Sequence, residues 1–496
     1  MTELPFKTFL RRIVLVAMLT SVFVNFAAAQ DRKNVLFIAV DDLRPELGCY
    51  GKQYMTTPNI DALASRGVLF ESAYCMVPTC GASRAAVMSG RRPAPTRFRN
   101  YLTWLSKEVP DAMPLHAQFK NDGYTAISIG KIFHHMDDHA DDWSEPPVRH
   151  QRIRYFNEPA RQASIAEHKR KYPNSNRERR GPASESADVA DEEYGDGQSA
   201  TVAIEKLEQF SKNPEQPFFL AVGFNKPHLP FIAPKKYWDM YDRSEIKIAE
   251  NHQTPDDVPK VALHQSGELR AYSDIPPRGP MDESKAIDLI HGYRASISFI
   301  DAQIGRIIET LDRTGLAEDT IIVLWSDHGW QLGEHGLWNK HSCFETSMWT
   351  PLIISVPGDD AIKAGQRATG IVELIDLYPT ICELSGVAAP ENLDGNSLVP
   401  ALQDPAVELK PYAIGRYQFG DTIRTKDFRY TEFRGKAGGS SGKGPVGMGK
   451  IMGRMMFSHA SDPNENENVA NKDRFQDAMQ QLSAELNANK GQPYEK

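Results

Sequence analysis

Short runs of apolar residues alternate along the chain with segments in which apolar residues recur every three or four positions. The first pattern predicts buried strands and the second predicts helices. Strands are predicted over residues 33–40, 124–129, 217–224, 320–325 and 351–356. Helices are predicted over residues 57–66, 199–210, 284–311 and 373–384. Buried strands that alternate with helices are typical of an α/β domain with a large, mostly parallel central sheet flanked by helices.

The N-terminus has the pattern of an export signal. Three basic residues precede an apolar run over residues 13–26, and three alanines end at Ala29. This order predicts a signal peptide over residues 1–29, cleaved near Ala29, and an exported protein, periplasmic or secreted. A membrane anchor is the weaker alternative, because the run is short and charged residues follow it at once. We therefore expect no stable membrane span.

Three internal segments interrupt the strand and helix pattern. Residues 135–198 and 241–283 are polar and poor in aliphatic side chains, which predicts two insertion loops. Residues 435–453 are rich in glycine and predict a flexible loop. Past residue 405 the pattern changes to short β-like runs followed by a polar tail. We therefore expect a main domain over residues 30–405 and a small C-terminal α+β subdomain over residues 406–496.

Composition narrows the possible functions. The 496 residues include 57 Lys and Arg against 65 Asp and Glu, for a net charge of −8. This balance argues against a nucleic-acid partner, since binding to phosphates needs clustered basic residues. It leaves room for a locally positive site that takes an anionic substrate. The five Cys are too few for a disulfide framework, so they are either buried free thiols or include one with a chemical role.

The ends of the predicted strands carry most of the candidate chemistry. In open α/β sheets, ligands bind beyond the carboxyl ends of the strands. Four side chains at these ends can form an oxygen-rich metal site: Asp41, Asp42, Asp327 and His328. Such a shell suits one hard divalent cation, Ca²⁺ or, less well, Mg²⁺. The alternative is that each Asp caps a helix or a turn.

A second group of candidate residues is basic. Its members are Arg84, Lys131, His134, His228 and Lys340. Beside a cation, these side chains would form a pocket for an anion with several oxygens, such as a phosphate or sulfate ester. The alternative is that the Lys and Arg side chains are solvated and that each His makes a structural hydrogen bond.

The segment from Cys80 to Arg91 reads Cys-Gly-Ala-Ser-Arg-Ala-Ala-Val-Met-Ser-Gly-Arg. A helix is expected to begin near Cys80 and to end at Gly90. The positive end of the helix would favour an anion at the Cys80 side chain, so physical reasoning alone indicates an activated cysteine nucleophile.

The same segment resembles the signature of the type I sulfatases, the formylglycine-dependent family. Within it, the chain is most similar to iduronate-2-sulfatase and its bacterial relatives. The matching segments are NVLFIAVDDLRPELGCYG, SGRRPAPTRF, GYTAISIGKIFH, PFFLAVGFNKPHLPF, SDHGWQLGEHGLWNK and DTIRTKDFRYTEF. They occur from residue 34 to about residue 433. Ala82 stands where Pro is commoner in the family, and Ser89 stands where Thr is also found.

The resemblance implies an alkaline-phosphatase-like sulfatase fold and a role for each candidate residue. It makes Asp41, Asp42, Asp327, His328 and the modified Cys80 ligands of one Ca²⁺. Cys80 would become Cα-formylglycine, made by a formylglycine-generating or an anaerobic sulfatase-maturing enzyme. The remaining roles concern the sulfate and the leaving group: Arg84, Lys131 and His134 would steady the nucleophile and the sulfate, while His228 and Lys340 would lie at the leaving-group side.

The implied activity is removal of sulfate from a sulfated sugar or polysaccharide, such as a 2-O-sulfated uronate unit. Two alternatives remain open from the sequence. One is a phosphonate or phosphate ester hydrolase of the same superfamily. The other is a glycan-binding pseudo-sulfatase in which Cys80 is never converted.

Overall fold

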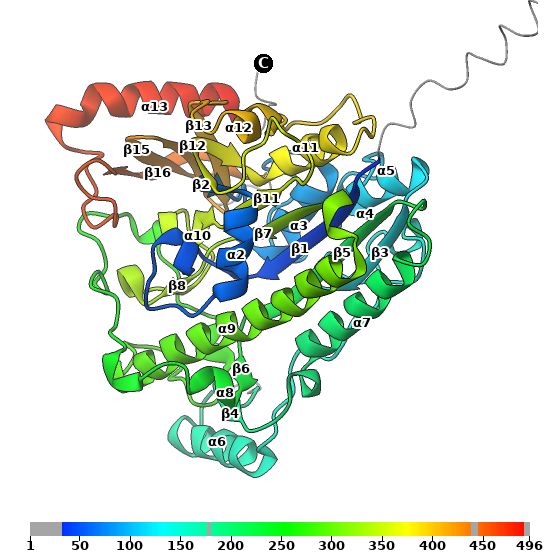
Figure 1. Cartoon of the computed structure of the whole chain (residues 1–496). Helices are drawn as coiled ribbons and strands as arrows, with labels where there is room; N and C mark the ends of the chain where they lie inside the picture. The colour runs from blue at the N-terminus through cyan, green and yellow to red at the C-terminus, as the bar shows by residue number, and fades with distance from the viewer. Residues whose placement is uncertain (1–31, 176–179, 438–444, 491–496) are drawn as a thin grey trace, which may run out of the picture.

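Eight strands form the central sheet of the computed structural model, which describes residues 32–175, 180–437 and 445–490 (Figure 1). The strands are β1 (Asn34–Asp41), β2 (Val68–Tyr74), β3 (Thr125–Gly130), β5 (Phe218–Pro227), β7 (Thr320–Ser326), β10 (Trp349–Thr350), β11 (Leu352–Ser355) and β12 (Gln366–Glu373). Their order is β10-β2-β11-β7-β1-β5-β3, and β12 also pairs with β2. The predicted signal peptide lies outside the described residues.

The centre of the sheet is parallel, as the sequence predicts. Strand β1 pairs in parallel with β5 and with β7, and β5 pairs in parallel with β3. Strand β11, the last strand predicted for the sheet, runs antiparallel to both of its neighbours, β7 and β2. The carboxyl ends of β1, β3, β5 and β7 therefore meet at one edge of the sheet.

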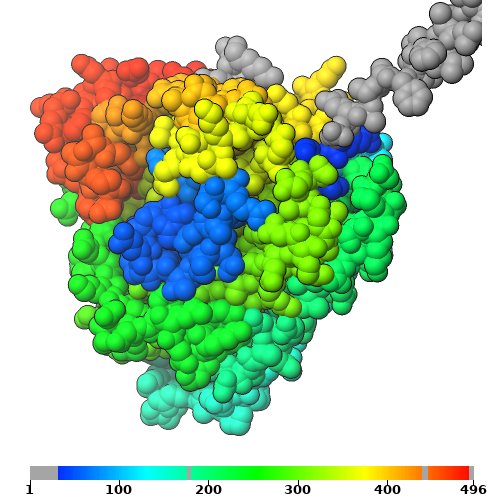
Figure 2. Space-filling model, viewed as in Figure 1, coloured from blue at the N-terminus to red at the C-terminus, as the bar shows by residue number. Residues whose placement is uncertain are grey.

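Helices cover both faces of the sheet, because alternate residues of each strand point to opposite sides. Val35 and Phe37 of β1 belong to one buried core, and Leu36 and Ile38 belong to the other. The core around Leu36 is covered by α2 (Pro58–Arg66), α7 (Gly195–Phe210) and α9 (Glu283–Thr314). The core around Val35 is covered by α3 (Cys80–Ser89), α5 (Leu115–Asn121) and α11 (Leu377–Leu384). Figure 2 shows the face over α2 and α9 closed by side chains.

The long helix α9 illustrates how the sequence sets the ends of an element. The Asp282 side chain accepts a hydrogen bond from the Lys285 backbone N–H at 3.2 Å, which caps the first turn. Gly315 follows the last turn with φ 75°, a left-handed conformation that glycine adopts without strain. The predicted helix is confirmed, with a few more residues at its C-terminal end.

A second, smaller sheet lies in the C-terminal part of the chain (Figure 1, orange and red). It is antiparallel and is formed by β13 (Tyr412–Tyr417), β14 (Gly420–Thr425), β15 (Phe428–Lys436) and β16 (Val446–Ser458). Helix α13 (Gln476–Asn489) packs on it through Leu482 and Leu486. Residues 446–453 were expected to belong to a flexible loop, and this expectation is wrong. They form part of β16, whose pairing with β15 satisfies the backbone in spite of the glycines.

The two predicted insertions contain short elements. Residues 135–198 include α6 (Glu158–Lys171) and β4 (Ser184–Ala187), and β4 pairs with β6 (Phe231–Pro234). Residues 241–283 include three single 3-10 turns, at Arg243–Glu245, Lys260–Ala262 and Leu269–Ala271. The remaining short elements are α4 (Leu105–Glu108), α8 (Lys235–Trp238), β8 (Gln331–Leu332), β9 (Trp338–Asn339), α10 (Glu345–Met348) and α12 (Val399–Gln403). In the described part of the chain, no helix combines the length and the apolar character that crossing a membrane requires.

Candidate active site

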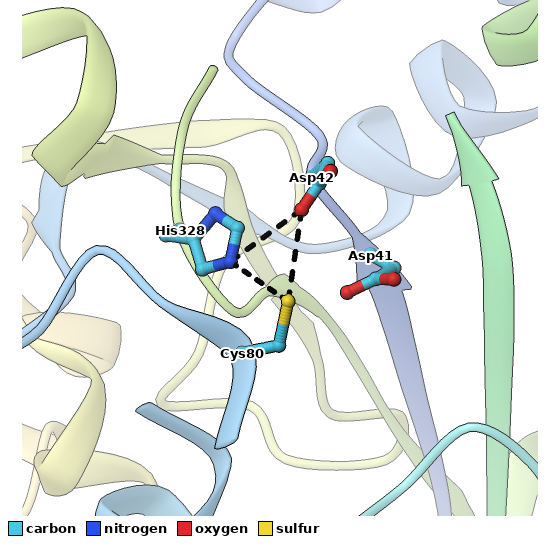
Figure 3. Close-up of side chains that lie close together, drawn as sticks. All are labelled: Asp41, Asp42, Cys80 and His328. Atoms are coloured by element: carbon cyan, nitrogen blue, oxygen red, sulfur yellow. Dashed lines mark hydrogen bonds and ion pairs between the residues drawn. The ribbon is translucent and has the colours of Figure 1, made fainter. Parts of the chain in front are cut away.

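Three acids and a histidine meet where β1 and β7 end (Figure 3 shows Asp41, Asp42 and His328). Asp41 is the last residue of β1, and Asp42 follows it with φ 63°. The Asp42 backbone N–H donates to Asp327 Oδ1 at 3.2 Å. The Nε2 atom of His328 lies 3.4 Å from Asp42 Oδ1 and 3.6 Å from Asp327 Oδ1. The left-handed backbone at a non-glycine residue is typical of a functional turn.

Cys80 begins helix α3 and points into the same group of side chains. Its Sγ atom lies 3.3 Å from His328 Nε2 and 3.9 Å from Asp42 Oδ1 (Figure 3). One ligand atom from each of Asp41, Asp42, Cys80 and His328 falls within 4.8 Å of all the others. Two carboxylates, an imidazole and a sulfur, all buried, form a candidate site for a metal ion.

The surroundings of Cys80 do not favour a thiolate. Burial raises the pKa of the Cys80 thiol well above its usual value, and the neighbouring Asp41 carboxylate raises it further. The start of a helix is not enough to offset these effects. The surroundings of the unmodified side chain therefore do not support the expectation of a directly activated cysteine nucleophile, because the acids that could bind a metal also disfavour a negative sulfur.

Arg84 and Lys131 hold the buried acids in place. The Arg84 Nε atom donates to Asp327 Oδ2 at 2.7 Å, and its terminal nitrogen lies 3.4 Å from Asp41 Oδ1. The Lys131 ammonium also contacts the Asp41 carboxylate. Burial alone would raise the pKa of Asp41, but Lys131, His228 and Arg84 together lower it well below its usual value. Asp41 therefore stays ionised at the bottom of the site.

Gly130 allows the Lys131 backbone to come close to the neighbouring strand β5. The glycine ends β3 with φ 73°, and a Cβ atom there would lie 1.9 Å from the Gly223 carbonyl oxygen. With no side chain at this position, the Lys131 N–H can donate to the same oxygen at 2.8 Å. The chain then turns so that the Lys131 side chain reaches the end of β1.

Asp42 has a different environment from Asp41. Burial raises the pKa of Asp42 well above its usual value, and although the Lys340 charge lowers it, the nearby Asp41, Glu268 and Asp327 carboxylates add to the increase. The Lys340 ammonium lies 3.1 and 3.0 Å from the two Asp42 oxygens. Crowded acids of this kind are stabilised when a cation binds between them.

His228 and Lys340 share a partner that the sequence did not indicate. Glu268 places Oε1 2.8 Å from His228 Nε2 and Oε2 2.9 Å from the Lys340 ammonium. The other ring nitrogen of His228, Nδ1, lies 2.7 Å from the Leu229 carbonyl oxygen. Burial would raise the pKa of Glu268, but Lys340 and His228 lower it well below its usual value. Glu268 is thus a carboxylate that orients two cationic or proton-bearing groups.

A cavity of about 600 Å³ opens above Cys80. Four of the predicted site residues line it: Cys80, His134, His228 and Lys340. Arg84 and Lys131 do not line it, because they lie behind the acids. Burial and the adjacent Lys131 charge lower the pKa of His134 to about 2, so this imidazole is neutral at ordinary pH.

The walls of the cavity come from segments whose sequence gave no site prediction. Both predicted insertions contribute, as do the strands and a turn of the C-terminal sheet. The residues concerned are Arg152, Arg180, Val261, His264, Glu268, Tyr417, Phe419 and Phe433. Apart from Phe433, which ends the matching segment DTIRTKDFRYTEF, none of them follows a predicted strand or belongs to a motif. Only the polar composition of the insertions indicated that they lie at the surface, where substrate contacts are common.

Comparison with known proteins identifies the family. The sulfatase family model matches residues 33–387. The chain belongs to the sulfatase family. It is also 31% identical to human iduronate 2-sulfatase (Homo sapiens), in an alignment that covers 91% of this chain and 94% of that protein. The chain is therefore a sulfatase related to the iduronate 2-sulfatases, an enzyme that hydrolyses sulfate esters, and the resemblance seen in its motifs is confirmed.

Solved structures confirm the fold of this sulfatase. A phosphonate monoester hydrolase from Silicibacter pomeroyi superposes with a TM-score of 0.70 at 21% identity, covering 92% of this chain and 94% of that one. A protein in complex with its substrate D-glucosamine-2-N,6-O-disulfate superposes with a TM-score of 0.69 at 21% identity, covering 92% and 97%. At this level of identity the likeness establishes the architecture alone.

Proposed function

We propose that this sulfatase removes sulfate from a sulfated sugar, a 2-O-sulfated uronate or a related polysaccharide unit, by means of a Cα-formylglycine made from Cys80 and one Ca²⁺. The observation that carries the proposal is the position of Cys80. Its Sγ atom lies between His328 and Asp42 and at the end of a cavity that His228 and Lys340 also line. The relationship to iduronate 2-sulfatase supports the choice of sugar.

The donor set fits a hard divalent cation. Asp41, Asp42, His328 and Cys80 offer ligand atoms close to one another, and Asp327 Oδ1 lies 3.6 Å from His328 Nε2. With Cys80 modified, these residues would hold Ca²⁺, since carboxylate oxygens dominate the set. The raised pKa of Asp42 supports this choice, because a cation would relieve the repulsion among the acids. When bound, the ion would neutralise the negative charge that gathers around the sulfate group.

Modification of Cys80 accounts for a cysteine in a place that disfavours a thiolate. As an aldehyde hydrate, the modified side chain would supply one hydroxyl that attacks sulfur and a second hydroxyl whose deprotonation releases the sulfate. The maturing enzyme would act before the chain folds, because the folded chain leaves Cys80 only 2% exposed. We also propose that the protein is exported, on the basis of the segment before residue 30.

Each remaining side chain has a role that follows from its contacts. Arg84 and Lys131 keep Asp41 ionised. Lys340 brings a positive charge to the leaving-group side of the cavity, where it shares Glu268 with His228. His228 would give the proton on Nε2 to the sugar oxygen as the bond between sulfur and that oxygen breaks, so that the sugar leaves as a neutral alcohol.

Two measurements test the proposal. The mass of the peptide that contains Cys80, from protein produced in its native host, should match formylglycine. The same protein should release sulfate from 2-O-sulfated uronate units faster than it hydrolyses phosphonate or phosphate monoesters. A cysteine mass together with binding but no sulfate release would instead indicate a glycan-binding pseudo-sulfatase, and faster phosphonate hydrolysis would indicate the other alternative.

A further inference from the structure

The cavity above Cys80 has more positive charge than one sulfate ester needs. Among the described residues that line it, the charged side chains are Arg152, Arg180, Lys340 and Glu268. Glu268 already pairs with Lys340 at 2.9 Å. The guanidinium groups of Arg152 and Arg180 therefore have no carboxylate partner among the described residues of the cavity wall.

Arg152 differs in this respect from the arginines beside it in the sequence. Arg149 donates to the His134 carbonyl oxygen at 3.2 Å, and Arg154 pairs with Glu193 at 3.0 Å. Within the described residues, the half-buried Arg152 side chain makes neither a hydrogen bond nor an ion pair. A cation that is partly removed from water and unpaired is costly unless a ligand completes its surroundings.

Arg152 lines the same cavity as His228, the residue proposed to protonate the departing sugar oxygen. Its positive charge acts on His228 and on Lys226, two residues at the end of β5. Burial lowers the pKa of Lys226 to about 7, and the Arg152 charge contributes to that lowering. Arg180 reaches the same wall, since its backbone N–H donates to the Ala271 carbonyl oxygen at 3.3 Å.

We infer that Arg152, with Arg180 beside it, forms a second anion subsite that selects sugars with another anionic group next to the sulfate ester. The inference rests on the proposed function and adds to it the group that determines specificity. A planar guanidinium can bind either a carboxylate or a sulfate through two parallel hydrogen bonds. The second anion is therefore a uronate carboxylate or a second sulfate.

Binding and turnover together test the subsite. Cys80→Ala protein, which cannot turn over substrate, is titrated calorimetrically with two matched pairs of ligands. The first pair is a 2-O-sulfated uronate disaccharide and its carboxyl-reduced, neutral-sugar counterpart. The second pair is glucosamine 2-N,6-O-disulfate and glucosamine 6-O-sulfate. We expect the doubly anionic member of at least one pair to bind at least tenfold more tightly, and the pair that shows this difference identifies the second anion.

Variants of Arg152 then test whether this residue causes the tighter binding of the doubly anionic sugars. Adding Arg152→Gln should remove the tenfold difference while changing the affinity for the singly anionic member less than threefold. Arg152→Lys should restore part of the difference, because it keeps the charge but loses the paired geometry. Arg154→Gln is the matched control and should leave both affinities unchanged, since Arg154 lies outside the cavity wall.

Several outcomes would overturn the inference. These are equal affinity within both pairs, equal loss for both members in Arg152→Gln, and no binding by any of the four sugars. The proposed function is judged separately, by sulfate release from protein with Cys80 intact. The protein with Cys80 intact could release sulfate while Arg152→Gln keeps the same binding preference as the unaltered residue. That combination would reject the subsite and support the sulfatase activity.

Discussion

The Nε2 atom of His228 lies 2.8 Å from Oε1 of Glu268, and the two residues come from different parts of the fold. His228 follows the end of β5, whereas Glu268 comes from the irregular segment before α9. Because Nδ1 of His228 faces the Leu229 carbonyl oxygen at 2.7 Å, both ring nitrogens face oxygen atoms. Burial and the nearby Lys340 charge lower the pKa of His228 to about 3, whereas the Glu268 carboxylate opposes this lowering, so the ability of the ring to hold a second proton on the side that faces the cavity depends on Glu268.

Replacing Glu268 with Gln should lower kcat by about 10- to 100-fold, the range seen when a partner that orients a functional histidine is lost. The amide cannot hold a proton between the two groups or pair with Lys340. The measurement is sulfate release from the preferred sugar, with kcat and KM determined separately. Glu245→Gln is the control, since Glu245 is exposed in the same insertion. A Glu268→Gln protein with unchanged kcat would contradict this role.

Replacing Cys80 with Ala should reduce turnover by at least about 1000-fold, because the nucleophile is lost while the cavity remains. The change removes a single buried atom, so the thermal unfolding midpoint should move by only a few degrees. Sulfate release and a melting curve on the same preparation test both statements. Cys49→Ala is the control, since Cys49 lies outside the cavity. Full activity in the Cys80 variant would remove this residue from the mechanism.

The proposed cation should contribute to both activity and stability, so its removal should lower both. Asp41, Asp42 and His328 are buried beside Cys80, and only the native state brings them close enough to bind one ion. A ligand at 100 times its Kd stabilises the native state by about 2.7 kcal/mol. Dialysis against a chelator should lower the melting midpoint, and Ca²⁺ should restore it at lower concentration than Mg²⁺. Asp41→Asn protein, with a weakened site, should respond less; an equal response in that variant would place the stabilising ion elsewhere.

The sequence was most informative where a regular element determines the position of a side chain. The carboxyl ends of parallel strands meet at one edge, so Asp41 and Asp327 could be brought together from the predicted strands alone. Glu268 could not, because it precedes a single 3-10 turn in a segment without periodicity. Arg152 could not be predicted for the same reason.

Two further differences between the sequence predictions and the structure have a local cause. Residues 446–453 have the composition of a loop, but pairing with β15 turns them into a strand, which composition does not reveal. Cys80 has the helix position of an activated thiol, but the acids around it come from β1 and from beyond β7. Their effect on its pKa depends on distances that only the folded chain defines.

His116 should make the stability of the protein sensitive to acid. The ring is buried and stacks on Trp143 with 3.9 Å between ring centroids. Burial, with a smaller contribution from His139, lowers its pKa to about 3, against an ordinary value of 6.5. Between these values the unfolded chain binds a proton and the folded chain does not, so stability is lost as the pH falls from 6.5 towards 3. From pH 7 to pH 4.5 the loss from this residue should be about 2 to 3 kcal/mol.

Replacing His116 with Phe should remove this contribution, because phenylalanine keeps the stacked ring and cannot take up a proton. The free energy of unfolding, measured in denaturant at pH 7 and at pH 4.5, should fall less in the variant than in the unaltered protein. His252→Phe is the control, since His252 is exposed. A packing change would alter the free energy of unfolding by the same amount at both pH values. The difference between the two pH values therefore reports the proton effect alone. Equal pH dependence in the His116 variant and the unaltered protein would show that acid acts on the fold through other groups.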